Sequence, residues 1–502
     1  MDVEGTTIRF GELQVGSLLC VELPVGWWVG YISSMSDVIV IGGGLAGLAA
    51  SVALAEAGVA VTLLESRPRL GGRASSFEDV ATGELIDNCQ HVAMGCCTNF
   101  RHFCRVTGIE ASFRRERDLF FIEPPKFRTN KSPGVCRFSA MPLPAPLHLG
   151  AAFLRLSYLS LREKLALARG LKALAREQSE ANGQRSFADW LATQRQPANV
   201  IERFWWVVLV SALSESLDRV SVAAARKVFV DGFLAHRHGW EVWLPTVPLE
   251  TLYSGQLTNW LATHGVEVRL KSGVERLAVE NDRISAVDLR SGERLSAAHV
   301  VLAVPHHRVR SFLPDNWQVQ PPFDRLERLE SAPIASVHLW FDRPITELPH
   351  AVLVGRLSQW VFNRGQGEQA QSHYYQVVIS NAREMLERSQ DVVLADVVAE
   401  LKEVWPEAAS AELRHSRMVV EHKAVFSPLP GSEESRSPQQ SPIANLQLAG
   451  DWTQTGWPAT MEGAVRSGFL AAENILRHRG HPTKCLQPNL PVSWLSRLLF
   501  GL

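Results

Sequence analysis

The sequence predicts an α/β fold built around a parallel sheet, and three observations carry that prediction. A continuous apolar run at 37–41 leads into a glycine-rich turn and then into an Ala/Leu-rich segment over 45–57. That is the order of a buried parallel strand and its crossover helix. A second apolar run at 59–64 supplies the next strand. Because 502 residues exceed one ordinary core, we expect a second domain beside the sheet.

The composition excludes several classes of protein. Hydrophobic residues make up 46% and charged residues 21% of the chain, as in globular proteins. The formal net charge of −1 argues against a general attraction to nucleic acid or to an anionic membrane. Seven cysteines without C-x-x-C pairs or histidines at zinc spacing indicate reduced thiols and no metal site. We therefore expect a cytoplasmic protein with no nucleic-acid partner.

One segment, 38–55, has 18 residues without a charge and has the length of a membrane span. Three consecutive glycines divide it into a β-branched part and an Ala/Leu-rich part, which fits strand, turn and helix better than one helix. We expect no transmembrane helix. Residues 1–34 lack the basic start of a signal peptide, and we expect them to form a loose extension before a fold that begins at Met35.

The glycine-rich turn predicts a site for a nucleotide pyrophosphate. Gly42, Gly44 and Gly47 match G-x-G-x-x-G between a strand and a helix. The first permits the tight turn, the second lets the backbone approach the phosphates, and the third lets the helix pack closely on the strand. Glu65 ends the second strand, 18 residues past Gly47, where a carboxylate accepts hydrogen bonds from a ribose diol. An acid at this position disfavours NADP.

The residues after Glu65 favour FAD over NAD. The run through Arg67 ends in Leu-Gly-Gly72-Arg73 and resembles the second fingerprint of the flavin amine oxidase and phytoene desaturase superfamily. The resemblance implies a Rossmann-type, GR2-like FAD-binding domain in three discontinuous segments, with an inserted α+β substrate-binding domain. Gly72 would let the cofactor pass close to the backbone. Arg73 would offer a planar fork to phosphate or carbonyl oxygens.

The second segment of the FAD domain is expected between two strands. Runs at 265–270 and 299–305 have strand character and enclose a hairpin. By the resemblance, the backbone of Val274 contacts the adenine. The resulting boundaries assign the extension to 1–34, the FAD domain to 36–110, 240–310 and 420–480, the substrate domain to 111–239 and 311–419, and an apolar tail to 481–502.

The third segment contains the most unusual composition in the chain. A strand at 446–449 ends at Gly450 and Asp451, and a helix begins at Met461 with the sequence M-E-G-A-V. By the same resemblance, Asp451 binds the ribityl or phosphate region. The helix start, from Met461 to Val465, would direct its dipole at the flavin edge where negative charge grows on reduction.

The segment after Arg73 narrows the family. Residues 87–91 read D-N-C-Q-H, a polar cluster unlike the glycine-rich version of the amine oxidases. With the L-G-G-R loop and G-W-P-A-T-M-E-G-A-V at 456–465, this cluster makes the chain from about residue 36 resemble the squalene-associated FAD enzymes, the hydroxysqualene dehydroxylases of bacterial hopanoid synthesis. The resemblance implies a hydrophobic isoprenoid substrate. An external electron donor, a reductase or NAD(P)H, is then required.

Reductive removal of a hydroxyl group requires a hydride for the carbon and a proton for the departing oxygen. On this hypothesis His91 is the acid or hydrogen-bond anchor, and Asp87 orients its ring and raises its pKa. The aromatic faces of Trp457 and Trp452 would stabilise a carbocation-like intermediate. A structural role for His91, fixing the loop under the flavin, is the alternative.

Three other functions are also consistent with the sequence. An isoprenoid desaturase would run the flavin in the opposite direction and oxidise the chain. A flavin amine oxidase would present an aromatic pair and a lysine near the flavin, whereas the segment around Trp457 offers one aromatic residue and no lysine stands out. A non-enzymatic protein would bind FAD without turnover.

Two apolar segments predict a wall of the substrate domain or contact with a membrane surface. Residues 142–178 and 494–502 combine wide apolar faces with Arg and Lys. Ordinary core helices with snorkelling basic side chains, and a chain end docked on its own domain, are equally good interpretations. Membrane contact would make the protein peripheral, on the inner face of the bacterial inner membrane.

Overall fold

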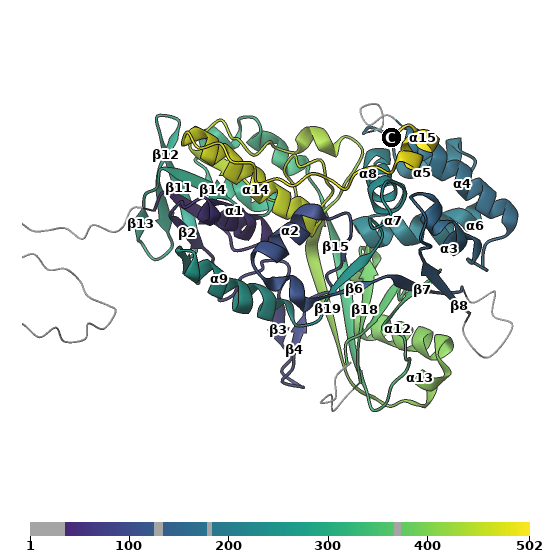
Figure 1. Ribbon diagram of the computed structural model, residues 1–502. Helices are drawn as coiled ribbons and strands as arrows, with labels where there is room; N and C mark the ends of the chain where they lie inside the picture. The colour runs from purple at the N-terminus through teal and green to yellow at the C-terminus, as the bar shows by residue number, and fades with distance from the viewer. Residues whose placement is uncertain (1–35, 125–133, 178–182, 366–372) are drawn as a thin grey trace, which may run out of the picture. The chain divides into compact units, whose positions relative to one another are not determined.

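Five parallel strands form the sheet that carries the glycine-rich turn (Figure 1). The computed structural model describes residues 36–124, 134–177, 183–365 and 373–502. The sheet order is β10–β2–β1–β14–β20, and every neighbouring pair is parallel. Its strands come from three separated parts of the chain: β1 (Val38–Ile41), β2 (Val61–Leu64), β10 (Val266–Arg269), β14 (His299–Leu302) and β20 (Leu446–Leu448). The predicted Rossmann-type fold in discontinuous segments is confirmed.

Side-chain alternation along β1 shows what covers each face of this sheet. Val38 and Val40 belong to the core that the sheet shares with α1 and α14, while Ile39 and Ile41 belong to the core on the opposite face. The covering elements are helices α1 (Leu45–Glu56) and α14 (Met461–His478) on one side. On the other side lies the antiparallel meander of β11 (Val274–Glu280), β12 (Arg283–Leu289) and β13 (Arg294–Leu295).

Helix α1 is apolar all round because α14 covers the side that faces away from the sheet. All residues from Leu45 to Ala55 are buried. The two helices approach closely at Gly468, where a Cβ would lie 2.2 Å from the carbonyl oxygen of Ala46. Small residues at this crossing therefore place the amino ends of α1 and α14 near each other, at the carboxyl edge of the sheet.

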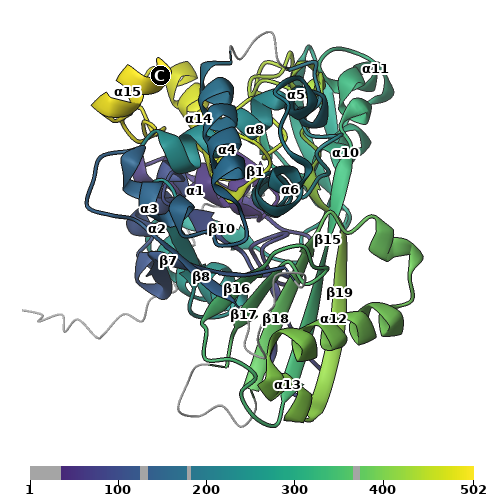
Figure 2. The ribbon, with the colours of Figure 1, turned by 90° about the vertical axis from the view of Figure 1, so that its right-hand side faces the viewer.

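A second sheet has seven strands (Figure 2). Val377 and Ile379 face a core with α12 (Gln390–Val404) and α13 (Pro406–Ser410), whereas Val378 faces the helical region. Within this seven-stranded sheet, β16 and β7 pair in parallel and the other neighbouring strands pair antiparallel. In sheet order the strands are β19 (Leu413–Phe426), β15 (Ser331–Phe341), β18 (His373–Ser380), β17 (Trp360–Asn363), β16 (His350–Leu353), β7 (Asp118–Ile122) and β8 (Val135–Ser139).

The helical region buries a cluster of large aromatic residues. Trp190, Trp205 and Trp240 have at most 1% of their surface exposed. The C-terminal helix lies against α4, and the Arg176 guanidinium donates to the carbonyl oxygen of Leu499 (3.3 Å). The helices are α3 (Gly150–Leu154), α4 (Leu161–Arg176), α5 (Phe187–Thr193), α6 (Ala198–Val200), α7 (Trp206–Leu213), α8 (Val222–Phe229) and α15 (Trp494–Phe500), with π-helical turns η4 (Ile201–Trp205) and η5 (Val230–Leu234).

Short elements join the two sheets. They are β3 (Ser76–Glu78), β4 (Leu85–Asp87), β5 (Ala93–Met94), α2 (Thr98–Val106), β6 (Phe113–Glu116), β9 (Val242–Pro245), α9 (Leu257–Thr263), α10 (His306–Val309) and α11 (Asp315–Gln318). Among the residues described, no helix combines the length and the apolarity that crossing a membrane requires. The extension expected at 1–34 lies outside the described residues.

Candidate functional site

A cavity of about 790 Å³ runs from the carboxyl edge of the parallel sheet to helices α7 and α8. The wall contains most of the residues singled out from the sequence. Those that line it are Gly42, Gly44, Glu65, Arg67, Gly72, Arg73, His91, Val274, Gly450, Asp451, Trp452, Trp457 and Met461. Gly47, Asp87 and Val465 are not among the lining residues.

The glycine turn has the geometry that a pyrophosphate needs. Gly42 has a φ of 109°, and a Cβ there would lie 2.4 Å from the Ala303 carbonyl oxygen. A Cβ on Gly47 would lie 2.0 Å from the Gly42 carbonyl oxygen, so Gly47 allows the close packing of helix on strand. At Gly44 the nearest heavy atom to such a Cβ is 3.9 Å away, and no side chain caps the start of α1. An open cradle with free helix N–H groups fits the phosphates of a dinucleotide.

Glu65 is held at the cavity wall by backbone N–H groups. Gly43 N donates to its Oε2 and Arg67 N donates to its Oε1, both over 2.8 Å. Ser66 Oγ also donates to Oε1 over 3.1 Å. A carboxylate oxygen accepts about two hydrogen bonds, so Oε2 keeps capacity for a ribose hydroxyl. Val274 begins β11 and Arg67 lines the same part of the wall. These residues fit the adenosine half of FAD.

Arg73 and Asp451, both expected to bind the cofactor, also bind each other. Arg73 Nη2 donates to Asp451 Oδ1 over 2.7 Å, and Nη1 donates to the carbonyl oxygen of Ala424 over 2.8 Å. Burial works to lower the pKa of Arg73, but the adjacent Asp451 carboxylate raises it above the usual value. The ion pair therefore joins the L-G-G-R loop to the end of β20 and presents a fixed polar surface to the cavity.

The helix start at Met461 faces the cavity, but Val465 does not. Thr460 caps α14 by accepting a hydrogen bond from Gly463 N over 3.1 Å. Val465 has 0% exposure and packs in the core between α1 and α14. One helical turn carries it about 6 Å further along the helix axis than Met461. The expectation that Val465 contacts the cofactor is therefore wrong, and its role is core packing.

Within the D-N-C-Q-H cluster, His91 and Asp87, which were expected to interact, have different hydrogen-bond partners. His91 lines the cavity, and its Nδ1 donates to the carbonyl oxygen of Cys89 over 2.9 Å. Asp87 is buried and accepts instead from Ser76 Oγ (2.7 Å), Leu249 N (2.8 Å) and Arg364 Nη2 (2.9 Å). Asp87 therefore joins β4 to three other segments and does not orient the imidazole.

The pKa of His91 is lowered, contrary to the expectation of a raised value. Burial is the largest cause, the Cys89 carbonyl and Asp87 act in the opposite direction, and Arg73 adds to the lowering. With Nδ1 donating to Cys89, a neutral ring presents an unprotonated Nε2 to the cavity. His91 is consequently a hydrogen-bond acceptor toward a ligand near neutral pH.

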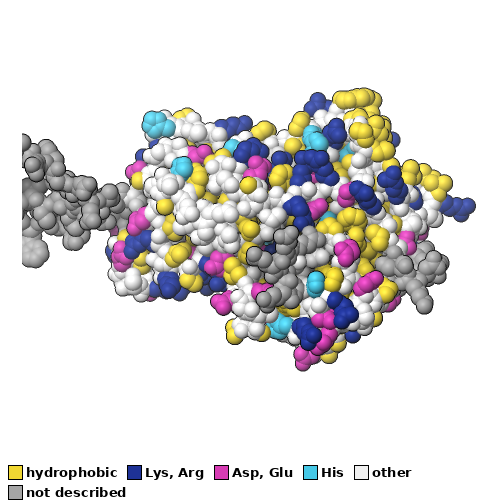
Figure 3. Space-filling view, turned by 60° about the horizontal axis from the view of Figure 1, so that its bottom comes forward, with side chains coloured by type: hydrophobic (Ala, Val, Ile, Leu, Met, Phe, Trp, Pro, Cys, Tyr) yellow, Lys and Arg dark blue, Asp and Glu magenta, His cyan; other side chains and the backbone are white. Residues whose placement is uncertain are grey.

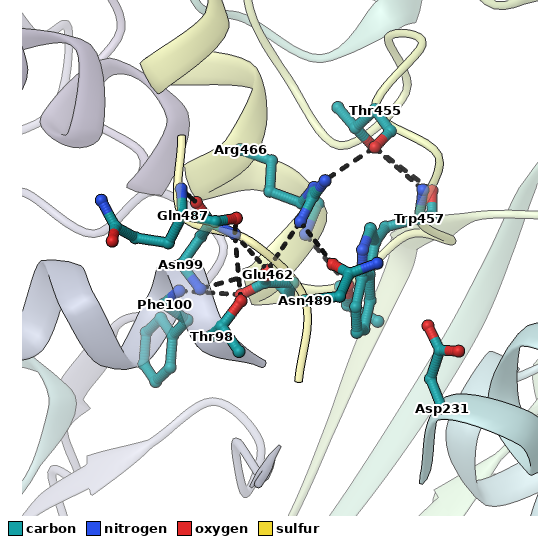
Figure 4. Close-up of polar contacts among 12 residues, drawn as sticks. Thr98, Asn99, Phe100, Asp231, Thr455, Trp457, Glu462, Arg466, Gln487 and Asn489 are labelled. Atoms are coloured by element: carbon teal, nitrogen blue, oxygen red, sulfur yellow. Dashed lines mark hydrogen bonds and ion pairs between the residues drawn. The ribbon is translucent and has the colours of Figure 1, made fainter. Parts of the chain in front are cut away.

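The Trp457 ring contacts a lysine of the cavity wall that the sequence analysis did not identify. Lys227 Nζ lies 4.5 Å from the centroid of the Trp457 ring and 2.6 Å from Asp231 Oδ2. Lys227 lines the cavity, and Figure 4 shows Asp231 below Trp457, on a different segment of the chain. The one signal in the sequence was the i,i+4 spacing of Lys227 and Asp231 on an otherwise apolar segment.

Glu462 is the second residue that sequence reasoning did not assign (Figure 4). Its carboxylate has 0% exposure and accepts from Phe100 N (2.8 Å), Asn99 N (3.2 Å) and Asn99 Nδ2 (2.9 Å) at the start of α2. Burial raises its pKa, against the lowering by these donors and by Arg466. Glu462 thus ties α2 to α14. Gln487 N donates to Asn99 Oδ1 over 2.8 Å and fixes the C-terminal tail to the same network.

Known proteins share this architecture. A family model described as flavin containing amine oxidoreductase matches residues 45–476. The 15-cis-phytoene desaturase of Synechococcus elongatus is 29% identical over 462 residues, covering 88% of this chain and 95% of that protein. A probable zeta-carotene desaturase of the same organism is 25% identical, covering 88% and 98%. A solved oxidoreductase from Methanosarcina mazei has a similar fold, with a TM-score of 0.67, 17% identity and coverage of 86% and 98%.

Proposed function

The chain belongs to the flavin-containing amine oxidoreductase family and is an FAD-dependent oxidoreductase, and from that premise we propose that it removes a hydroxyl group from a long-chain isoprenoid alcohol, as in the conversion of hydroxysqualene to squalene. Gly44 and Glu65 would hold the adenosine and pyrophosphate of FAD, and Arg73, Asp451 and the start of α14 its flavin end. When bound and reduced, FAD supplies the hydride that the substrate carbon receives. An external reductant restores the reduced cofactor.

The cavity wall supports an isoprenoid substrate. Beyond the flavin end, the wall is formed by apolar side chains of the seven-stranded sheet and of the helical region. They include Leu119, Phe121, Phe138, Leu156, Phe204, Val207, Phe233, Trp240, Val352 and Phe362. A hydrocarbon chain placed there leaves water without losing hydrogen bonds. The names of the matched relatives, phytoene and zeta-carotene desaturase, also refer to long isoprenoids.

The observation that carries dehydroxylation is the presence of charged side chains in this apolar wall. Lys227 pairs with Asp231 and lines the cavity together with His91. A buried polar group left without a hydrogen-bond partner costs free energy, and an all-hydrocarbon ligand gives no partner to the other N–H groups of Lys227 or to Nε2 of His91. A ligand with one hydroxyl group supplies a matching polar atom. Such an alcohol is the substrate that the cavity supports best.

Desaturation of an isoprenoid hydrocarbon is the second candidate, and the relatives favour it. Two of the matched proteins carry that activity in their names. The apolar part of the wall suits either substrate, so it does not separate the two reactions. Desaturation needs little acid–base chemistry, however, and gives no role to the charged side chains of the cavity.

One experiment separates the two reactions. The FAD-loaded enzyme is photoreduced without oxygen and mixed with hydroxysqualene, while flavin absorbance and squalene are measured. We expect the oxidised flavin spectrum to return as squalene forms, one molecule for each flavin. A flavin that stays reduced, with no squalene formed, contradicts the proposal. In the parallel sample, oxidised enzyme receives phytoene, and a reduced flavin with a product two mass units lighter would establish desaturation instead.

We also propose that the enzyme takes its substrate from an anionic lipid surface. Apolar side chains of α4 and α15 stand in solvent beside basic ones, and Figure 3 shows such a mixture at the upper right, on the side that carries these helices in Figure 1. The exposed apolar residues are Leu161 (66%) and Leu165 (57%) on α4, Trp494 (67%) and Leu498 (73%) on α15, and Leu147 (49%) and Leu154 (64%) in the segment before α4. The basic residues are Arg155, Arg162, Arg169, Lys172, Arg176 and Arg497.

The same surface adjoins the substrate cavity. Leu156 and Tyr158 lie in the connection from α3 to α4 and line the cavity from inside. Lys164 Nζ donates to the carbonyl oxygen of Leu154 over 2.7 Å and holds the two helices together. Apolar residues that enter a bilayer and basic residues that meet anionic headgroups would bind this face to the membrane that dissolves the substrate.

A further inference from the structure

We infer that Lys227 is a catalytic residue that binds the substrate hydroxyl group and gives it a proton as the carbon–oxygen bond breaks. Asp231 is its positioning residue, and the Trp457 ring lies against its ammonium group. This inference rests on the dehydroxylation proposed above. The general acid of the reaction is then Lys227 on α8, in place of His91 of the D-N-C-Q-H cluster.

The position of Lys227 suits a donor to a bound alcohol. An ammonium group has three N–H donors, and Nζ forms an ion pair with Asp231 Oδ2 at 2.6 Å. The Trp457 ring lies over Nζ at 4.5 Å. About a quarter of the Lys227 side chain, 24%, is exposed, and the residue lines the cavity. At least one N–H group is therefore available to a ligand oxygen.

Asp231 supplies the counter-charge that an ammonium group in an apolar wall requires. The two residues are one helical turn apart, on the continuous helical path of α8 and η5, so their relative position is set by backbone geometry. Trp457 comes from the loop before α14, whose start faces the predicted flavin position. Trp457 therefore lies between the Lys227 ammonium group and the end of the cavity where the flavin is expected.

The proton and charge balance of the step agrees with this arrangement. The carbon–oxygen bond breaks, the oxygen takes the Lys227 proton and leaves as water, and the carbon becomes cationic before it receives the hydride. Because the amine becomes neutral as the carbon becomes positive, the total charge in the cavity does not change. A tryptophan face attracts either cation, so Trp457 can stabilise both states. Lys227 then regains a proton from water.

His91 does not fill this role in the structure. Its Nδ1–H is engaged by the Cys89 carbonyl, which leaves Nε2 as an acceptor in the neutral ring. The burial that lowers its pKa also disfavours the doubly protonated form that an acid would need. His91 can accept the hydrogen of the substrate hydroxyl group, while Lys227 donates to its oxygen.

The first test compares Lys227→Met with Lys402→Met, a matched change at an exposed lysine of α12. The dissociation constants of hydroxysqualene and squalene are measured from changes in oxidised-flavin absorbance, and turnover is measured with the photoreduced enzyme. For Lys227→Met we expect unchanged FAD content and squalene affinity, loss of the preference for the alcohol, and a rate about 100-fold lower or more. Lys402→Met should behave like the wild type. An unchanged preference and rate in Lys227→Met would overturn the inference.

The second test uses Lys227→Arg to separate binding from proton transfer. Arginine keeps the charge, the Asp231 pair and the aromatic contact, but its guanidinium does not give up a proton in proteins. We expect the preference for the alcohol to persist while the rate falls about 100-fold. A wild-type rate would exclude Lys227 as the proton donor. This variant also serves if Lys227→Met fails to fold.

Failure of the proposed function is distinguishable from failure of this inference. If the wild-type enzyme does not convert hydroxysqualene, dehydroxylation is wrong, whatever the variants do. If the wild type converts it and Lys227→Met does so equally well with the same alcohol preference, dehydroxylation stands and Lys227 is not its donor.

Discussion

The Arg73 guanidinium donates to the Asp451 carboxylate over 2.7 Å, from Nη2 to Oδ1, across 378 residues of sequence. The pair joins the loop that follows β2 to the loop that follows β20, at the edge of the sheet where the flavin end of the cofactor is expected. Both parts of the FAD site are thereby held in one arrangement before any ligand arrives. Pre-ordering of this kind reduces the entropy lost on binding.

Replacing Arg73 should therefore weaken FAD binding. The change Arg73→Met removes a charged hydrogen bond, which contributes about 1.5–3 kcal/mol, and leaves Asp451 without its counter-charge. We expect FAD to bind at least about 10-fold more weakly, measured by titration of the apoprotein with FAD fluorescence. Arg105→Met, at a 59% exposed side chain, is the control and should bind FAD normally. Equal affinities in the two variants would contradict the assigned role.

Two glycines of the first motif should respond differently to alanine. Gly44→Ala adds a Cβ whose nearest protein atom is 3.9 Å away, so the apoprotein should keep its melting temperature while the added methyl group blocks the pyrophosphate. Gly47→Ala adds a Cβ 2.0 Å from the Gly42 carbonyl oxygen and should lower the melting temperature of the apoprotein itself. Thermal melts with and without FAD measure both effects. A Gly44→Ala protein that binds FAD as well as wild type would show that the cofactor does not use this cradle.

The stability of the apoprotein should fall in acid because of His338. This imidazole has 0% exposure, and burial, with Arg364 and Arg417, lowers its pKa to about 3. The unfolded chain takes up a proton near pH 6.5, well before the folded protein does. The stabilising contribution is therefore complete above pH 6.5 and is lost as the pH falls toward 3.

Between pH 6.5 and 5 this single histidine accounts for about 2 kcal/mol of the free energy of unfolding. Urea unfolding of the apoprotein at pH 7.5 and pH 5.0 measures the loss. Between these two pH values, the free energy of unfolding of His338→Gln should fall by about 2 kcal/mol less than that of the wild type. His481→Gln, at an exposed histidine, should retain the wild-type dependence. Identical pH dependence in wild type and His338→Gln would refute the assignment.

The exposed face of α4 and α15 should bind anionic vesicles. We expect the full-length protein to sediment with phosphatidylcholine vesicles that contain phosphatidylglycerol, and much less with phosphatidylcholine alone or in 0.5 M salt. Leu498→Glu removes apolar area and adds repulsion, and should reduce the bound fraction about 10-fold. Leu386→Glu is a matched change at another exposed leucine, 46% exposed, and should leave binding intact. Equal binding by both variants would remove this face as the docking surface.

Much of the candidate cofactor site could be predicted from the sequence alone, because the backbone conformations and side chains that bind a dinucleotide depend on short stretches of the chain. Gly42 and Gly44 act through backbone conformation and missing side chains, which are properties of the residues themselves. Glu65 follows a strand whose apolar run is visible in the sequence, and Met461 opens a helix after a cap-forming threonine. Each of these depends on a few neighbouring residues and on periodicity, so each could be placed without knowing the fold.

Only the tertiary structure decided which polar groups face the cavity. Asp87 stands four residues from His91, yet its partners are Ser76, Leu249 and Arg364, brought together by sheet packing. Lys227 meets Trp457 across 230 residues of sequence, through the docking of α8 on the loop before α14. The sequence by itself determined an FAD-binding α/β protein, because glycine turns and apolar periodicity are local. The partners of buried charges are set by packing between distant segments, and no local pattern records them.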